Sequence, residues 1–191
     1  CIVCDDASDD HVLSEIRILC ARDERFQLIL HSKNVGFYKN FERALSYVTS
    51  DTEYIALCDQ DDYWYPEKLT RLTNVFTQGT ALVYSDMRLV DGQGTTIANT
   101  YWTGRKNTYT NLRVLMTANT ITGAACLFGK NLLDTILPFP NRVSDAYHDH
   151  WIAMAAFMNG SIRYIPEPLY DYRQHEGNVI GHTSFNRPHM I

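Results

Sequence analysis

Three carboxylates stand together in Asp59-Gln60-Asp61-Asp62, directly after the apolar run Tyr54–Cys58. Ligands of open parallel sheets gather at the carboxyl ends of strands, so these side chains are well placed to bind one. Mg²⁺ and Mn²⁺ prefer oxygen ligands and commonly bridge one or two carboxylates to a phosphate group. The pattern therefore indicates a divalent-metal site. A solvated acidic turn is the alternative, because a bare D-x-D pattern is common.

A second pair of carboxylates, Asp5 and Asp6, also follows a short apolar run, Cys1–Cys4. If Cys1–Cys4 and Tyr54–Cys58 are parallel neighbours, both acidic groups lie at the same edge of the sheet. Aspartates in that position accept hydrogen bonds from a ribose hydroxyl in nucleotide sites. The pattern favours nucleotide binding, and an N-cap for the helix that follows is the simpler alternative.

A third candidate, Asp149, stands between two histidines just before the apolar run Trp151–Met158. No cysteine pair or H-E-x-x-H spacing accompanies His148 and His150, so we do not expect zinc. A carboxylate between aromatic rings at a helix start suits a general base. Capping that helix is an equally good alternative.

The segment Tyr172-Arg173-Gln174-His175 follows a strand-like run near the other end of the chain. Arg173 offers a forked donor for phosphate, and a neutral His175 can bind a divalent cation. Aromatic residues at positions 63–65, beside the acidic segment, suit stacking on a sugar or base ring, although core packing is their more frequent use.

The elements that must position these groups alternate between strand-like and helix-like patterns. We expect strands at 1–4, 26–30, 54–58, 81–90, 124–128, 162–165 and 169–172, and helices after residue 10, over 37–48, from Pro66, at 112–116 and at 151–158. The β-α-β-α-β order of the first half predicts a parallel sheet with helices on both faces. Pro166-Glu167-Pro168 predicts a rigid turn between the last two strands.

Composition narrows the class of protein. The 191 residues are 45% hydrophobic and 20% charged with a formal net charge of −5, which excludes a disordered chain and argues against a nucleic-acid partner. Five cysteines, an odd number, favour free thiols in a reducing compartment, and we expect Cys1 and Cys4 to be core residues. The longest apolar run, Trp151–Met158, is far shorter than the roughly 20 residues of a bilayer span. We therefore expect one compact α/β domain in the cytoplasm.

In combination, these segments resemble an inverting glycosyltransferase of family two. Residues 3–10 resemble its V-x-D-D-x-S-x-D nucleotide segment, 34–41 its N-x-G-x-x-x-N segment, and 57–64 its D-x-D region, in which Gln60 and Trp64 are similar to the rhamnosyltransferase-like branch. Residues 122–125 look like the strand on the acceptor side, 148–151 resemble the catalytic-base segment, and 172–178 resemble the closing segment. The match keeps the family's order from residue 1 to about residue 181.

The resemblance implies the GT-A fold, an α/β Rossmann-like mixed sheet flanked by helices. It implies a single domain over residues 1–191, with a nucleotide-binding part over about 1–90 and an acceptor and catalytic part over about 91–181. The family's first strand and helix precede the segment that residue 1 opens, so we expect both to be missing here.

The resemblance also implies a reaction: transfer of a sugar, with inversion, from a dTDP-rhamnose or UDP-hexose type of donor to a glycan or lipid-linked acceptor in cell-surface polysaccharide synthesis. Such an acceptor is consistent with peripheral association at the inner face of the membrane. Matching positions assign Asp149 as the base, Asp5, Asp6, Lys39, Asp59 and Arg173 as donor-binding residues, and Asp61, Asp59, Asp62 and His175 as ligands of Mg²⁺ or Mn²⁺. A metal-dependent nucleotidyl or phosphoryl transferase and a non-catalytic sugar-nucleotide binding module remain alternatives.

Overall fold

The computed structural model describes residues 1–141 and 147–175. In chain order its elements are β1 (Ile2–Asp5), α1 (Asp10–Cys20), β2 (Gln27–Leu30), α2 (Phe37–Ser46), β3 (Tyr54–Ala56), β4 (Tyr63–Trp64), α3 (Lys68–Val75), β5 (Thr80–Val90), β6 (Thr96–Ala98), α4 (Leu112–Thr117), η1 (Gly123–Ala125), β7 (Cys126–Gly129), η2 (Lys130–Leu132), α5 (Leu133–Ile136), α6 (His148–Asn159) and β8 (Ser161–Arg173). No helix among these residues is long and apolar enough to cross a membrane.

The strands form two sheets. Strands β1 and β2 pair in parallel as a sheet of their own, whereas the larger sheet has the order β3-β7-β5-β8-β4, with β6 on β5. Only β5 and β8 pair in parallel in the larger sheet, and its other pairs are antiparallel. The expectation of a mixed α/β sheet flanked by helices is confirmed. The expectation of a continuous parallel sheet through the first half is wrong, because β7 inserts antiparallel between β3 and β5.

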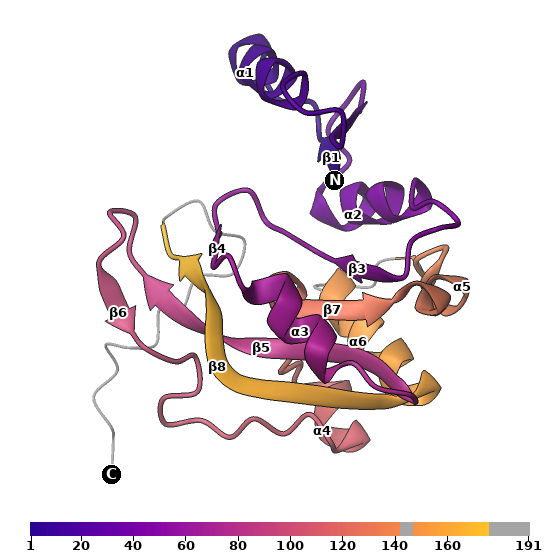
Figure 1. Ribbon diagram of the computed structural model, residues 1–191, viewed down its shortest axis with the longest axis vertical. Coiled ribbons are helices and arrows are strands. Elements are labelled where there is room, and N and C mark those ends of the chain that lie inside the picture. The colour runs from indigo at the N-terminus through magenta and orange to yellow at the C-terminus, as the bar shows by residue number, and fades with distance from the viewer. Residues whose placement is uncertain (142–146, 176–191) are drawn as a thin grey trace.

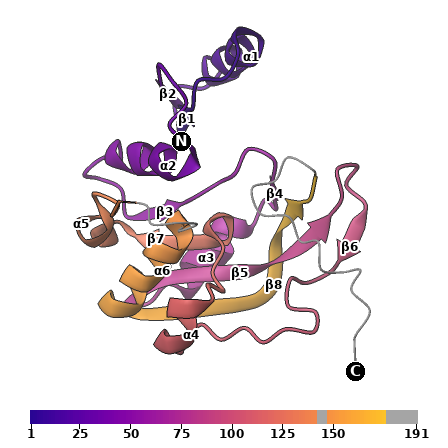
Figure 2. The same cartoon turned by 180° about the vertical axis from the view of Figure 1, so that it is seen from behind.

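Helices cover both faces of the larger sheet. Helix α3 lies on one face (Figure 1), and α6 and α4 lie on the other, as the reverse view shows (Figure 2). Helix α2 lies between the larger sheet and the small β1–β2 sheet (Figures 1 and 2). The small sheet therefore reaches the rest of the molecule chiefly through α2, whose Phe41 stacks on His148 of α6.

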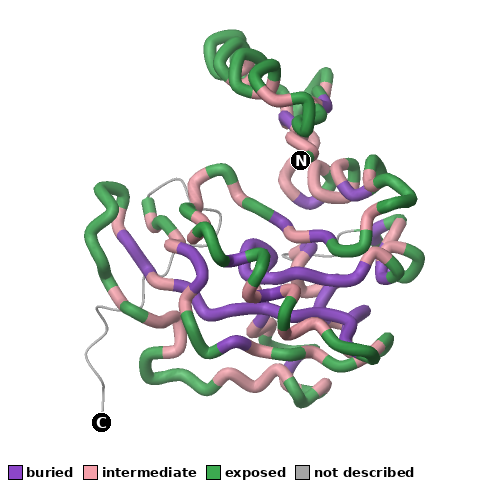
Figure 3. Tube along the Cα trace, viewed as in Figure 1, coloured by how far each residue is buried: buried purple, intermediate pink, exposed green. Residues whose placement is uncertain are grey.

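The core is centred on β5, which is buried along nearly its whole length (Figure 3). Side chains alternate across a strand, so Leu82 and Val83 belong to different apolar clusters, the first shared with α6 and the second with α3. Leu72 of α3 is 0% exposed in the second cluster. Burying such a leucine contributes about 1.5–3 kcal/mol. The sheet thus lies between two helical layers and packs against both.

Strand β8 corrects the sequence prediction at Pro166-Glu167-Pro168. The two strands expected at 162–165 and 169–172 are one strand of 13 residues. Its register with β5 shifts between Ser85 and Asp86 and again before Arg88. Proline lacks an N–H group and is tolerated where a strand is irregular. The prolines therefore bend the strand without ending it.

The N-terminal elements are the least covered. Asp9 caps α1 by accepting a hydrogen bond from the Val12 N–H at 2.9 Å, yet α1 buries no residue. Cys1 is exposed and Cys4 is partly buried. The expectation that both are core residues is therefore wrong for Cys1, because β1 pairs with β2 alone in the described part of the chain. All five cysteines are free, as predicted.

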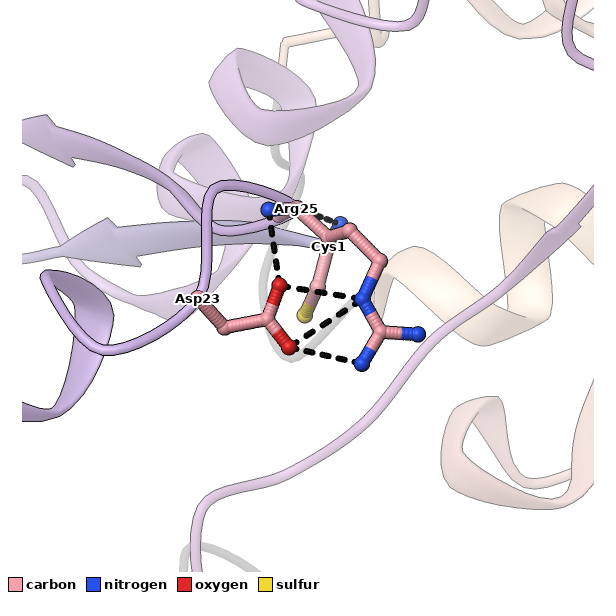
Figure 4. Close-up of polar contacts among 3 residues, drawn as sticks. All are labelled: Cys1, Asp23 and Arg25. Atoms are coloured by element: carbon pink, nitrogen blue, oxygen red, sulfur yellow. Dashed lines mark hydrogen bonds and ion pairs between the residues drawn. The ribbon is translucent and has the colours of Figure 1, made fainter.

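A short polar cluster closes the turn between α1 and β2 (Figure 4). The Asp23 carboxylate accepts hydrogen bonds from the guanidinium and the backbone N–H of Arg25, and the amine of Cys1 donates to the Arg25 carbonyl at 2.5 Å. These bonds to Arg25 lower the pKa of Asp23 to about 2. The contact is exposed, so it fixes the path of this turn and adds little stability.

Candidate active site

The acidic loop, residues 59–62, runs from β3 to β4 and is anchored at its far end on β8. Strand β4 pairs Tyr63 with Asp171 of β8. The Asp171 carboxylate also accepts two hydrogen bonds of 2.7 Å from the guanidinium of Arg88 and one of 2.5 Å from the Tyr65 hydroxyl. This network holds the acidic loop beside the end of β8, which carries Arg173 and leads to His175.

Negative charge is concentrated in the acidic loop. Burial, together with the charge of Asp61, raises the pKa of Asp59 to about 6. Burial and the two neighbouring carboxylates raise the pKa of Asp62 to about 7, while a hydrogen bond from the backbone of Arg173 acts in the opposite direction. Asp61 Oδ2 lies 2.9 Å from His175 Nε2. The structure thus brings all four predicted metal ligands to one region.

These side chains suit a divalent cation in charge and in donor type. Carboxylate oxygens and an imidazole nitrogen are ligands that Mg²⁺ and Mn²⁺ accept, and several carboxylates buried together are unfavourable unless a cation compensates their charge. Within the described part of the chain, no three His, Cys, Asp or Glu side chains converge as a metal cluster. The contact between Asp61 and His175 is therefore the nucleus of the candidate metal site.

Asp149 lies inside the first turn of α6, which begins at His148 with Tyr147 as its N-cap. The alternative that Asp149 is the N-cap is thereby wrong. Its Oδ1 accepts from the His150 N–H at 2.6 Å, and its Oδ2 accepts from the Gly123 N–H at 3.3 Å. Burial raises the pKa of Asp149 to about 6, and repulsion from Asp59 adds to that rise. The carboxylates of Asp149 and of the acidic loop therefore repel each other electrostatically.

Gly123 is required for the close approach of η1 to α6. A Cβ at this position would lie 2.9 Å from His148 Nε2 and 3.5 Å from Asp149 Cβ. The His148 ring cannot easily yield, because it is buried and stacks on Phe41 with ring centroids 4.1 Å apart. Burial lowers the pKa of His148 to about 4, so this ring is a neutral packing group. Zinc was not expected here, and His148 has the environment of a core residue.

A cavity of about 310 Å³ opens beside Asp149 and His150. One wall comes from Met87 of β5 and another from the end of α4 and the segment after it. Three tyrosines from separate places in the chain complete the lining. In sequence order these residues are Met87, Tyr101, Thr117, Asn119, Thr120, Ile121, Thr122, Tyr147 and Tyr172. The His150 Nε2 donates to the Leu115 carbonyl at 2.6 Å, because a carbonyl can only accept. This bond joins α6 to α4 and fixes the wall next to Asp149. A polar pocket with aromatic walls suits a sugar ring.

Asp5 and Asp6 do not share a sheet edge with the acidic loop, because β1 and β3 belong to different sheets. Both Asp6 oxygens are engaged, accepting hydrogen bonds of 2.8 Å from the N–H groups of Val35 and Gly36 at the start of α2. Asp5 is buried and accepts from the Ser8 N–H at 3.1 Å. The expectation of strand neighbours is therefore wrong. These two carboxylates organise the loops that flank β1 and α2.

Lys39 and Lys68 differ sharply in burial. Lys39, a predicted donor-binding residue, is exposed and pairs with Glu42 at 2.5 Å. Lys68, which the motifs did not single out, is 0% exposed. A signal was available, since Lys68 stands one helical turn before Leu72 on the buried face of α3.

The comparisons with known proteins agree with this architecture. Residues 1–137 match the family model described as Glycosyl transferase family 2. An uncharacterized protein of Mycobacterium tuberculosis is 42% identical over 72 residues, which are 37% of this chain and 20% of that protein.

Two solved structures extend the likeness to nearly the whole chain. S. aureus TarS 1-349, in complex with UDP-GlcNAc, has a TM-score of 0.68 at 20% identity, covering 93% of this chain and 50% of that one. The mannosyltransferase PcManGT from Pyrobaculum calidifontis, in complex with GDP-Man and Mn²⁺, has a TM-score of 0.64 at 15% identity, covering 93% and 48%. The chain thus spans about half the length of these proteins, and the fold is the GT-A fold.

Proposed function

The chain belongs to glycosyl transferase family 2, and from that premise we propose that it takes part in moving a sugar from a nucleoside-diphosphate sugar to an acceptor hydroxyl. The observation that carries the proposal is the position of Asp149. This carboxylate lines the cavity, is held by the Gly123 N–H, and is close enough to Asp59 to feel its charge. A base and an acidic donor loop on adjoining sides of one site are what such a transfer requires.

On the donor side, we propose that the acidic loop faces the diphosphate. Asp61 and His175, assisted by Asp59 and Asp62, would hold Mg²⁺ or Mn²⁺ there. When bound, the cation would neutralise negative charge on the leaving diphosphate. Arg173, at the end of β8, would add a forked donor to the same group. The mannosyltransferase neighbour, whose complex contains GDP-Man and Mn²⁺, supports this reading.

On the nucleotide side, we retain Asp5, Asp6 and Lys39 as proposed donor-binding residues over a nucleotide-binding part of about 1–90. Because both Asp6 oxygens already accept backbone N–H groups, Asp6 would act by shaping the turn at Val35 and Gly36. Donors of the dTDP-rhamnose and UDP-hexose types are the first to test.

On the acceptor side, Asp149 would take the proton from the attacking hydroxyl while the bond to the diphosphate breaks. The attack comes from the face opposite the leaving group, so the anomeric configuration inverts. General-base help of this kind is worth about 10²–10⁴ in rate. The cavity would hold the acceptor ring, a glycan or lipid-linked sugar, within the part spanning about 91–181. Cell-surface polysaccharide synthesis at the inner face of the membrane is the proposed setting.

The experiment is a donor screen with product analysis. The chain is incubated with dTDP-rhamnose, UDP-glucose, UDP-GlcNAc and GDP-mannose, with Mn²⁺ or EDTA, and released nucleoside diphosphate is quantified. Release of intact nucleoside diphosphate that requires Asp149 supports the proposal. Release of nucleoside monophosphate or pyrophosphate would indicate a nucleotidyl or phosphoryl transferase, and saturable binding without any product would indicate a binding module.

A further inference from the structure

Lys68, the first residue of α3, is a buried cation that the proposed reaction does not yet use. Its Nζ donates to the Ala124 carbonyl at 2.5 Å and lies 3.8 Å from the ring centroid of Trp64 and 4.1 Å from that of Tyr170. Among residues 1–141 and 147–175, no carboxylate oxygen comes within 4.0 Å of this Nζ. Burial of an ammonium without an ionic partner destabilises a fold, so this position calls for a reason other than stability.

The surroundings of Lys68 are those of a charged group. Two aromatic faces and a carbonyl oxygen are all favourable contacts for a cation. Burial lowers the pKa of Lys68 to about 7, while Asp62 and Asp59 act in the opposite direction. The positive charge of Lys68 in turn lowers the pKa of both carboxylates. The ammonium and the acidic loop are therefore electrostatically coupled without touching.

The contacts of Lys68 also place it between the acidic loop and the segment that holds Asp149. Trp64 belongs to β4, which directly follows the acidic loop. Ala124 belongs to η1, whose first residue, Gly123, donates to Asp149. A charge at this junction acts on whatever the acidic loop holds.

We propose that Lys68 is a positioning residue whose buried positive charge tunes the acidic loop, weakening its hold on a free divalent cation and strengthening its hold on the donor's diphosphate. The inference rests on the proposed function, because it presumes that the loop receives a metal and a diphosphate. Without the charge of Lys68, the carboxylates of the loop would bind the divalent cation tightly even when no diphosphate is present. With that charge, the loop binds the cation and the diphosphate together better than it binds the cation alone.

The test is Lys68→Met, which keeps the length of the side chain and removes its charge. Mn²⁺ alone is titrated by calorimetry, followed by whichever of dTDP, UDP and GDP binds the unchanged chain best, at saturating Mn²⁺. Loss of a unit charge that acts on the acidic loop without touching it should change these affinities by about three- to tenfold. We expect Mn²⁺ affinity to rise and nucleoside-diphosphate affinity to fall by that factor, with a melting temperature equal to or above that of the unchanged chain.

Two control variants separate charge from packing. Leu72→Met alters packing one turn along the same buried face of α3. Lys130→Met removes one positive charge, whose Nζ donates to the Ser50 carbonyl at 2.8 Å, before the start of β3 and away from the acidic loop. Neither is expected to move the two affinities in opposite directions.

Each outcome of the Lys68→Met titrations decides the inference. Opposite shifts of the two affinities support it. Shifts in the same direction, no shift, or a large drop in melting temperature overturn it, because Lys68 would then serve only the fold. If the unchanged chain binds Mn²⁺ but none of the three nucleoside diphosphates, the proposed function itself has failed.

Discussion

Replacing Asp149 by Asn should stabilise the protein at neutral pH while it removes the proposed general base. Its pKa of about 6, in place of an ordinary 3.8, means that the folded state binds this proton more tightly than the unfolded state does. Ionised Asp149 therefore destabilises the fold above pH 6, and the penalty disappears as the pH falls below the unfolded value. At about 1.36 kcal/mol per pH unit, the full penalty is about 3 kcal/mol.

The pH dependence makes the expectation specific. The penalty is about 3 kcal/mol at pH 7.5 and about 1 kcal/mol at pH 4.5, since Asp149 is then protonated in the folded state and only the cost of binding that proton remains. Asparagine offers one acceptor oxygen to the N–H groups of Gly123 and His150, and the lost hydrogen bond costs about 1 kcal/mol. We expect Asp149→Asn to be more stable by about 2 kcal/mol at pH 7.5 and nearly neutral at pH 4.5.

The assay is urea unfolding followed by tryptophan fluorescence at both pH values, beside the transfer rate and the nucleotide affinity. Transfer should fall by roughly 10²–10⁴ while nucleotide affinity stays near normal. Asp134→Asn, an exposed carboxylate on α5, is the control and should change neither quantity. The same stability difference at both pH values would refute the reasoning about burial, and an unchanged transfer rate would remove Asp149 as the base.

Three further outcomes are expected. Gly123→Ala should lower the free energy of unfolding in urea by about 1–3 kcal/mol and the transfer rate by roughly tenfold or more, because the new Cβ displaces the His148 ring. Gly92→Ala, with open space around it, is the control and should lower neither quantity. Ala7→Gly should gain about 1 kcal/mol, since Ala7 has a φ of 63°, and an unchanged unfolding midpoint would contradict that strain. Asp61→Asn should abolish the Mn²⁺ dependence of nucleoside-diphosphate binding in calorimetry, and wild-type-like dependence would remove Asp61 from the metal site.

Local patterns predicted the elements that position the site. The helical spacing of apolar residues located α1 and α2, and the acidic segment after Tyr54–Cys58 predicted the loop that the structure shows after β3. The apolar run at 151–158 predicted α6 but began it three residues late, since His148 is itself buried in the first turn. That difference placed Asp149 at the cap instead of inside the helix.

Non-local pairing could not be predicted in the same way. The sequence of residues 126–129 does not indicate that this short strand runs antiparallel between β3 and β5. The engagement of Asp6 by two N–H groups 29 and 30 residues away is likewise a tertiary contact that no local pattern indicates. The burial of Lys68 also escaped prediction, because lysine is rarely buried fully and the two rings that enclose it come from separate strands.

The place of β8 in the sheet has a consequence for the order in which the molecule can assemble during synthesis. Strand β5 pairs along its whole length with β8, and within the described residues β4 pairs with β8 alone. The downstream end of the acidic loop therefore has no strand partner until residues 161–173 have left the ribosome. At about 5–20 residues per second, several seconds separate the synthesis of the acidic loop from that of β8. The acidic loop thus lacks this anchor throughout that interval.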